Sequence, residues 1–332
     1  MKVEEPALDV RDLAVRFNTP DGTVHAVNGV SFHLAPGEFL GVVGESGSGK
    51  SVTVMSTLQL IPMPPGEITS GEVHFEGHDL LSVNDAHLRS VRGGRIGFIF
   101  QDPMTSLNPV LTIGKQLTES IRRHTDANRT EAKDRAIELL ELVGIPDAPQ
   151  RVKSYPHELS GGMRQRVMIA MSLTCSPRVI IADEPTTALD VTIQAQIIDT
   201  VRELREQLNT AVIWITHDLG VIAGLADRVI VMYGGRIVEE APVGPLYAEP
   251  LHPYTEGLLA SLPSEDGSTH KLESIPGQPP SLSSEPVGCS FAPRCKYAMD
   301  KCWTDTPTLD EVAGQQRRVA CWYDLAAGEA RA

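Results

Sequence analysis

The feature that most restricts the fold of this 332-residue chain is a glycine-rich segment, GESGSGKS, at residues 44–51. It fits the phosphate-loop pattern G-x-x-x-x-G-K-[ST] at every fixed position. The apolar run Phe39–Val43 precedes it, and a helix is predicted over Val52–Leu60. A flexible turn would need neither neighbour, whereas a nucleotide site needs a strand before the loop and a helix after it. The segment therefore predicts an α/β fold that binds a nucleoside triphosphate.

Each position of this loop has an expected role. Its glycines let backbone amides face phosphate oxygens, and the N-terminus of the following helix adds a positive dipole end. Lys50 would supply a cation for the β and γ phosphates, and Ser51 a hydroxyl for Mg²⁺. The expected ATP contacts are Gly44, Ser46, Gly47, Gly49, Lys50, Ser51 and Val52.

A second apolar run, Val179–Ala182, leads into Asp183 and Glu184. A buried strand that ends in two carboxylates is typical of the metal and water site of a phosphate-loop ATPase. We expect Asp183 to hold Mg²⁺ and Glu184 to polarise the attacking water as general base. Without the phosphate loop, the same pair would be interpreted as a solvated acidic turn.

Two further polar residues follow short apolar runs. Gln101 follows Ile96–Phe100 and can contact both Mg²⁺ and the water, and His217 follows Val212–Thr216 and can bond the γ-phosphate or the water. The runs lack alternation, which indicates strands buried on both faces of a parallel sheet. Ligands bind at the carboxyl ends of such strands, where these side chains are expected.

The remaining segments have different patterns. Short runs at 8–17, 26–34 and 71–75, separated by turn signals, predict antiparallel strands. Residues 130–143 place Ala132, Ala136, Leu139, Leu140 and Val143 on one helix face, and Gly144 is a C-terminal stop. After about Pro242, prolines including Pro276, Pro279, Pro280 and Pro286 indicate a linker and a small tail.

Ser160, Gly161 and Gly162 begin another predicted helix. Ser160 is a favourable N-cap, and the two glycines leave amides accessible to an anion. This second anion site has no lysine of its own. One solution is a head-to-tail dimer in which it covers the nucleotide of a partner, and the alternative is an ordinary capped helix.

These motifs in this order resemble the ATP-binding cassette (ABC) family over residues 5 to 240. The resemblance implies a P-loop NTPase fold with a RecA-like parallel sheet core, an N-terminal antiparallel β subdomain, a helical subdomain at about 105–165 and a small C-terminal extension. It implies that Ser160, Gly161 and Gly162 contact the partner's ATP. Asp190, after Ala188-Leu189, would lie at the dimer seam. Glu184 would be the base, His217 the switch histidine, and Phe17 the aromatic that stacks on adenine.

Segments after Gln101 resemble the ATPases of oligopeptide and dipeptide importers. They are QDPMTSLNP at 101–109, HPYT at 252–255, IPGQPP at 275–280 and the cysteine segment at 288–295. We expect a cassette at 1–242 and an importer-type extension at 243–332. The resemblance implies a heterodimer with a second ABC ATPase, two transmembrane permeases and an extracytoplasmic peptide-binding protein. Related systems import nickel or other small solutes.

Four cysteines, Cys289, Cys295, Cys302 and Cys321, lie in the tail with spacings x5, x6 and x18. Tight C-x2-C pairs, which are typical of zinc, are absent from this spacing. Four cysteines can instead hold a [4Fe–4S] cluster, as in some members of the resembled branch. Zinc and plain reduced thiols are the alternatives. Cys175 is expected to be a small buried residue.

Composition and charge limit which partners and which cellular location we expect for the protein. The net charge of −14 argues against a general nucleic-acid binder. No apolar stretch reaches the roughly 20 residues that span a bilayer, and the acidic N-terminus lacks a signal core. We expect a peripheral subunit on the cytoplasmic face of the cell (inner) membrane. A soluble ABC ATPase without a transport role, and a regulator that senses iron or redox state through its tail, are the rival hypotheses.

Overall fold

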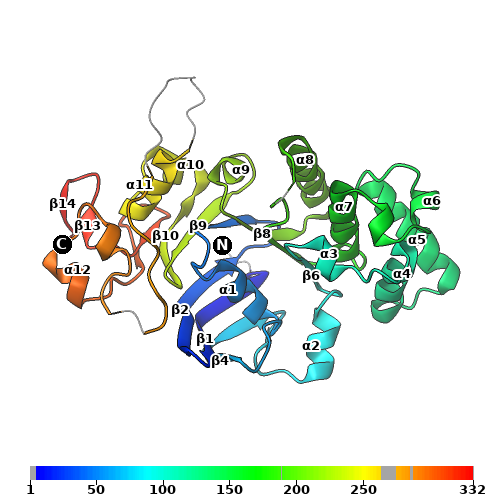
Figure 1. The fold of residues 1–332 in the computed structure, drawn as a ribbon, viewed down its shortest axis with the longest axis horizontal. Coiled ribbons are helices and arrows are strands. Elements are labelled where there is room, and N and C mark those ends of the chain that lie inside the picture. The colour runs from blue at the N-terminus through cyan, green and yellow to red at the C-terminus, as the bar shows by residue number, and fades with distance from the viewer. Residues whose placement is uncertain (1–4, 188, 263–273, 285–286, 332) are drawn as a thin grey trace. The chain divides into compact units, whose positions relative to one another are not determined.

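The computed structural model describes residues 5–187, 189–262, 274–284 and 287–331 (Figure 1). Ala188 and Pro286, which belong to predicted segments, lie outside the described residues. The chain forms two compact units, and each is described by itself. Unit 1 comprises Met1–Leu8, Leu34–Glu38 and Ser82–Ile215, and unit 2 comprises Asp9–His33, Phe39–Leu81 and Thr216–Ala332.

Unit 1 contains three parallel strands in the order β8-β7-β6. They are β6 (Ile96–Ile99), β7 (Val179–Asp183) and β8 (Ala211–Thr216). Every residue of β7 and β8 is buried, which explains why their sequences are apolar without alternation. The strands predicted from these runs are confirmed.

Four helices of unit 1, α4, α5, α6 and α7, lie side by side (Figure 1). An Asn128–Glu131 capping box begins α5, and Gly144 follows its C-terminal end with φ 71°. The five apolar residues predicted for one face of this helix are all fully buried. The helices are α2 (Asp85–Val91), α3 (Pro103–Ser106), α4 (Ile113–His124), α5 (Arg129–Leu142), α6 (Ala148–Arg151), the 3₁₀ turn Pro156–Glu158, α7 (Gly161–Ser172) and α8 (Val191–Leu208).

Unit 2 contains an antiparallel sheet in the order β2-β1-β4-β5, as the N-terminal sequence predicted. Its strands are β1 (Leu8–Thr19), β2 (Gly22–Leu34), β4 (Gly66–Phe75) and β5 (His78–Asp79). A second set has the order β11-β12-β10-β9-β3, in which β3 and β9 are parallel. These strands are β3 (Phe39–Val43), β9 (Arg228–Tyr233), β10 (Arg236–Pro242), β11 (Asp310–Glu311) and β12 (Arg318–Val319). Helices α1 (Lys50–Thr57) and α9 (Leu219–Ala223) complete this part.

The part of unit 2 after Pro242 is more regular than its proline content predicted. Helices α10 (Val243–Ala248) and α11 (Pro253–Ala260) occupy the place where the linker was expected to begin, so that expectation is wrong. Pro253 is compatible with a helix because it is the first residue of α11, where no backbone N–H is needed. Later elements are the 3₁₀ turn Ala292–Arg294, α12 (Asp300–Thr304), β13 (Tyr323–Asp324) and β14 (Glu329–Ala330). In the described residues, no helix combines the length and apolar character needed to cross a bilayer.

A buried ion pair attaches the end of the chain to β10. Oε1 of Glu239 accepts hydrogen bonds from Nη2 of Arg317 at 3.0 Å and from the N–H of Leu251 at 2.9 Å. Its Oε2 accepts from the N–H of His252 at 2.9 Å. The Glu239 and Arg317 side chains are 0% and 4% exposed, so these three hydrogen bonds replace the ones that water would otherwise make to the carboxylate.

We expect Glu239→Ala to lower the free energy of unfolding by about 3–5 kcal/mol, because it leaves the buried Arg317 guanidinium without its carboxylate. Urea denaturation followed by tryptophan fluorescence measures the change. Glu72→Ala is the matched control, since Glu72 is 56% exposed beside His74 and its loss should cost less than about 1 kcal/mol. Equal losses in the two variants would contradict the buried anchor.

Candidate nucleotide site

The phosphate loop leaves β3 and enters α1 through backbone that requires glycine. Gly44 and Gly49 have φ 149° and 98°. A Cβ on Gly44 would lie 2.2 Å from the carbonyl oxygen of Met232, and one on Gly49 would lie 2.5 Å from that of Ala26. No side chain fits at these separations. The two glycines therefore allow the loop to lie directly against the backbone of β2 and β9.

Lys50 lies inside the loop with only 4% of its surface exposed. Its Nζ donates to the carbonyl oxygens of Gly44 at 2.7 Å and Glu45 at 2.9 Å. Ser46 and Gly47, at the tip of the loop, are exposed, while Ser51 and Val52 are half-buried. The loop thus holds an ammonium group at its centre and presents its tip to solvent, which suits an anionic ligand.

Unit 1 brings together two of the residues predicted to act on water. Oε2 of Glu184 accepts from Nε2 of Gln101 at 3.1 Å and from Oγ1 of Thr187 at 3.0 Å. Glu184 has φ 46°, and its N–H donates to the carbonyl of Ile215. Strand β7 ends at Asp183, which is 5% exposed. Sequence reasoning missed Thr187, although its position three residues after Glu184 is a detectable signal.

The residues predicted to form the second anion site lie together within unit 1. Oγ of Ser160 accepts from the N–H of Met163 at 3.3 Å and caps α7, and Oδ1 of Asp190 accepts from Ile193 at 2.9 Å and caps α8. A Cβ on Gly162 would lie 2.7 Å from Cγ2 of Ile193, so the two helix starts are adjacent. Ser160, Gly161 and Asp190 are exposed, and this surface is available to a second molecule.

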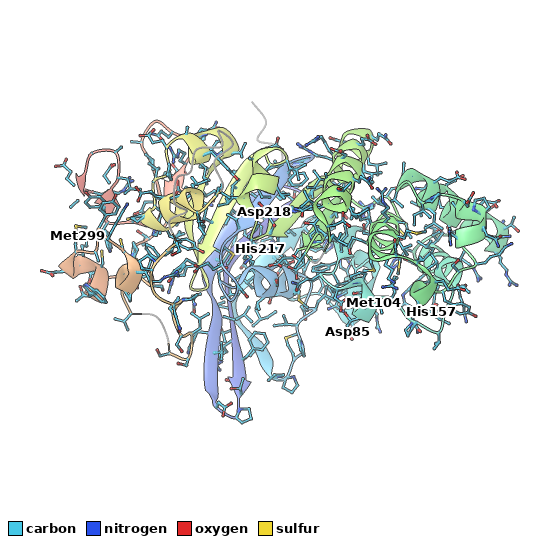
Figure 2. All side chains as sticks on the ribbon, turned by 45° about the horizontal axis from the view of Figure 1, so that its top comes forward. Asp85, Met104, His157, His217, Asp218 and Met299 are labelled. Carbon is cyan, nitrogen blue, oxygen red and sulfur yellow. The ribbon has the colours of Figure 1, made fainter. Side chains whose placement is uncertain are left out.

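The two remaining predicted contacts lie in unit 2. His217 is exposed and is followed by Asp218, whose carboxylate caps α9; Figure 2 labels both residues. Phe17 is half-buried on β1, where it pairs with Gly66 of β4. Their contacts with a nucleotide remain predictions.

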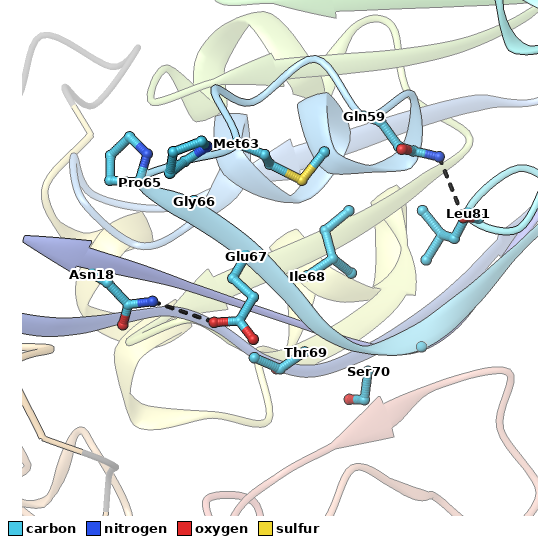
Figure 3. Close-up of a pocket in the computed structure, with 12 residues that line it drawn as sticks. Asn18, Gln59, Met63, Pro65, Gly66, Glu67, Ile68, Thr69, Ser70 and Leu81 are labelled. Carbon is cyan, nitrogen blue, oxygen red and sulfur yellow. Dashed lines mark hydrogen bonds between the residues drawn. The ribbon is translucent and has the colours of Figure 1, made fainter. Parts of the chain in front are cut away.

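A cavity of about 640 Å³ lies elsewhere in unit 2, between β1, β4 and the segment after α1 (Figure 3). Glu67 lies in its lining and bonds Asn18 at 3.2 Å. The Arg16 side chain hydrogen-bonded to Glu67 lowers the pKa of that carboxyl. The lining residues, Asn18, Gln59, Met63 to Gly71 and Leu81, contribute a carboxylate and no basic side chain. None of the predicted phosphate-binding residues lines this cavity, so it is separate from the phosphate loop.

The four tail cysteines converge, although they are far apart in sequence. They line one small pocket together with His252, Phe291, Tyr297, Trp322 and Tyr323. Burial raises the pKa of Cys289 to about 11 and that of Cys321 to about 12. Cys302 is buried and the other three are half-buried, as is Cys175, which was expected to be fully buried.

This convergence does not form a site for a single metal ion within the described residues. Within the described residues, no three His, Cys, Asp or Glu side chains are arranged to hold a metal ion. All five cysteines lie in that part of the chain, and none forms a disulfide. The structure therefore lends no support to the zinc ion, and the predicted [4Fe–4S] cluster is not shown.

Two known families match this chain, one in the predicted cassette and one mainly in the predicted extension. Residues 27–187 match the family described as ABC transporter, and residues 238–302 match the oligopeptide/dipeptide transporter C-terminal region. The oligopeptide transport ATP-binding protein OppD of Bacillus subtilis (strain 168) is 54% identical over 307 residues, covering 92% of this chain and 86% of that protein. AppD of the same organism is also named an oligopeptide transport ATP-binding protein. It is 53% identical over 302 residues, and the match covers 91% of this chain and 92% of AppD.

Solved structures agree on the fold. A dimeric ATP-binding cassette in a post-hydrolysis state, bound to ADP and Pi, is 28% identical with a TM-score of 0.64, and the match covers 71% of this chain and 98% of that one. The chain therefore belongs to the ABC transporter ATP-binding proteins, in the branch that carries the oligopeptide/dipeptide transporter C-terminal region.

Proposed function

We propose that this chain is the ATP-hydrolysing motor subunit of a membrane importer of di- and oligopeptides. The observation that carries this proposal is its 54% identity, over 92% of the chain, to a protein named for oligopeptide transport. The relatives give no support to nickel as cargo or to a soluble ATPase without a transport role. We retain residues 1–242 as the cassette and 243–332 as the importer-type extension.

In this proposal the phosphate loop binds MgATP. Lys50, now held by loop carbonyls, moves to the β and γ phosphates, and the exposed tip amides at Ser46 and Gly47 face their oxygens. Ser51, Asp183 and Gln101 would hold Mg²⁺, and Phe17 would stack on adenine. Gly44, Gly49 and Val52 would complete the binding segment through their backbone.

Glu184 would be the general base for the attacking water. Its contact with Gln101 supports this role, because an amide that bonds the base can also orient the water and respond to a neighbour. Thr187 restrains the same carboxylate oxygen. His217 would bond the γ-phosphate and complete the catalytic set.

We propose that two cassettes close head to tail around two nucleotides. The exposed helix starts at Ser160, Gly161 and Gly162, with Asp190 beside them, would cover the ATP of the partner cassette. The partner would be a second, similar ABC ATPase. Two permeases would anchor the pair at the cytoplasmic face of the cell membrane, and an extracytoplasmic binding protein would deliver peptides to them.

We also propose that Cys289, Cys295, Cys302 and Cys321 bind a [4Fe–4S] cluster. The support is the convergence of four thiols on one pocket, which is the donor set of such a cluster. A single ion needs all its ligands at one centre. In a [4Fe–4S] cluster each cysteine binds a different iron, so the four sulfurs do not have to share one centre. The cluster would hold together segments that have little core of their own.

Glu184→Gln should lower the rate of ATP hydrolysis by about 10²–10⁴-fold while ATP binding survives, because the amide keeps the shape but cannot accept a proton. Phosphate release by the assembled transporter and binding of a fluorescent ATP analogue measure the two properties. Glu141→Gln, on the exposed face of α5, is the control and should leave both unchanged. Normal turnover in Glu184→Gln would remove Glu184 from the role of base.

Deleting the gene should abolish uptake of a labelled oligopeptide and leave nickel uptake intact, because the proposed cargo is peptide. The wild-type gene should restore peptide uptake, and Lys50→Ala should not. As a control on location, the protein should pellet with membranes when its permeases are co-expressed. Peptide uptake that persists in the deletion strain, in the absence of a second peptide importer, would contradict the proposal.

Protein purified without oxygen should contain about four iron atoms per chain and absorb visible light, because four thiolates would hold the cluster. Replacing Cys295 by Ser should lower the iron content, and Cys175→Ser should not. Iron and sulfide analysis with visible spectroscopy provides the measurement. A colourless protein that contains one zinc, or no metal, would disprove the cluster.

A further inference from the structure

The second residue of the phosphate loop, Glu45, bears a carboxylate that the loop pattern does not require. Arg294, which lies in the cysteine-bearing tail of the same unit, donates hydrogen bonds to both carboxylate oxygens of Glu45. Nη1 donates to Oε2 at 2.6 Å and Nη2 donates to Oε1 at 3.0 Å. This is the bidentate geometry in which an arginine and a carboxylate interact most strongly. The Arg294 side chain is 4% exposed and that of Glu45 28% exposed, so water screens this pair less than a surface pair.

The guanidinium is itself fixed by the surrounding residues. Nε of Arg294 donates to the carbonyl of Pro276 at 2.9 Å, and Nη2 also donates to that of Ile275 at 3.3 Å. Nη1 lies 3.3 Å from the hydroxyl of Tyr233 at the end of β9. The arginine therefore has one defined position and can fix the carboxylate that it binds.

The backbone of the loop is restrained at the same residue. The N–H of Glu45 donates to the hydroxyl of Tyr254 at 2.8 Å, and Tyr254 is fully buried on α11. The side-chain carboxylate and the backbone N–H of Glu45 are thus both bonded by residues after Pro242. The bond to the tyrosine hydroxyl restrains the backbone at the second residue of the loop.

We propose that Arg294 and Tyr254 are positioning residues of the ATP site, through which the C-terminal extension holds the phosphate loop in its binding shape and neutralises Glu45. This inference rests on the proposed binding of phosphates by residues 44–51. An unpaired carboxylate within the loop would repel a triphosphate, and the bidentate arginine cancels that charge. The extension is then a part of the nucleotide site as well as an appendage to the cassette.

A purely structural anchor would be the simpler role for the same ion pair. The two roles differ in their dependence on charge. If Arg294 only holds the tail in place, its loss lowers stability whether or not Glu45 is charged. If it neutralises Glu45, removal of that charge restores ATP binding, and salt weakens the defect by screening the repulsion.

The test measures the dissociation constant of a fluorescent ATP analogue with Mg²⁺ for wild type, Arg294→Gln, Glu45→Gln and the double variant, each in the full-length chain. Arg294→Gln should raise this constant between about 10-fold and 100-fold, as expected for a misplaced binding group. Glu45→Gln, which keeps an acceptor but loses the charge, should bind nearly as wild type. The double variant should recover most of the lost affinity, and 0.5 M salt should reduce the defect of Arg294→Gln.

Lys296→Gln is the matched control. Lys296 lies two residues after Arg294, and its side chain is 64% exposed. The variant removes one positive charge, and ATP binding should not change. Arg294→Lys serves if Arg294→Gln does not fold, and its affinity should be intermediate because one charged bond remains. Tyr254→Phe removes only the hydroxyl acceptor and should weaken binding less than Arg294→Gln.

Two results would overturn the inference: unchanged affinity in Arg294→Gln, or a loss of affinity that Glu45→Gln does not restore. Lys50→Ala separates this outcome from failure of the proposed function. If Lys50→Ala abolishes binding while Arg294→Gln has no effect, only the positioning role is wrong. If Lys50→Ala still binds ATP normally, the proposed phosphate site itself is wrong.

Discussion

The close contact of the phosphate loop with neighbouring backbone is the constraint on which unit 2 depends. Gly44 and Gly49 approach the carbonyls of Met232 and Ala26 so closely that no side chain fits between them. The N–H of Gly235, in the turn after β9, donates to the carbonyl of Ser48 at 3.0 Å, so the loop is bonded to that turn as well. A loop fixed on several sides does not have to be ordered when phosphate arrives, and the entropy of ordering it is not subtracted from the binding free energy.

The C-terminal part of unit 2 is attached by buried ion pairs as well as by buried apolar side chains such as Tyr254 and Phe291. Glu239 and Glu240 are neighbours on β10; the first bonds Arg317, and the second bonds Arg228 and Arg318. Adjacent strand residues point to opposite faces, so these carboxylates hold the sheet from both sides. Such links add to the apolar contacts of a small segment, and the four cysteines converge in the same part of the chain.

Unit 1 combines a buried parallel sheet with exposed residues at the starts of α7 and α8. The parallel strands β7 and β6 carry Glu184 and Gln101 to one edge, where their side chains meet. The capped starts of α7 and α8 lie side by side and remain exposed. The unit therefore presents a preformed acid–amide pair and two adjacent, exposed helix starts, which are the components that the proposed composite site would use.

The sequence by itself determined the parts whose signal is local: the phosphate loop, the buried strands, the face of α5 and the order of motifs that identifies the cassette. Each depends on residues a few positions apart, and burial or a tight turn restricts those residues strongly. It misplaced the start of the linker at about Pro242, because the later proline cluster says nothing of α10 and α11, which come before it. Only the tertiary structure decided that Thr187 and Gln101 share one oxygen of Glu184, that four distant cysteines line one pocket, and that Arg294 binds Glu45. A pair 249 residues apart leaves no periodic trace in one sequence, since its partners meet only when the whole chain has packed.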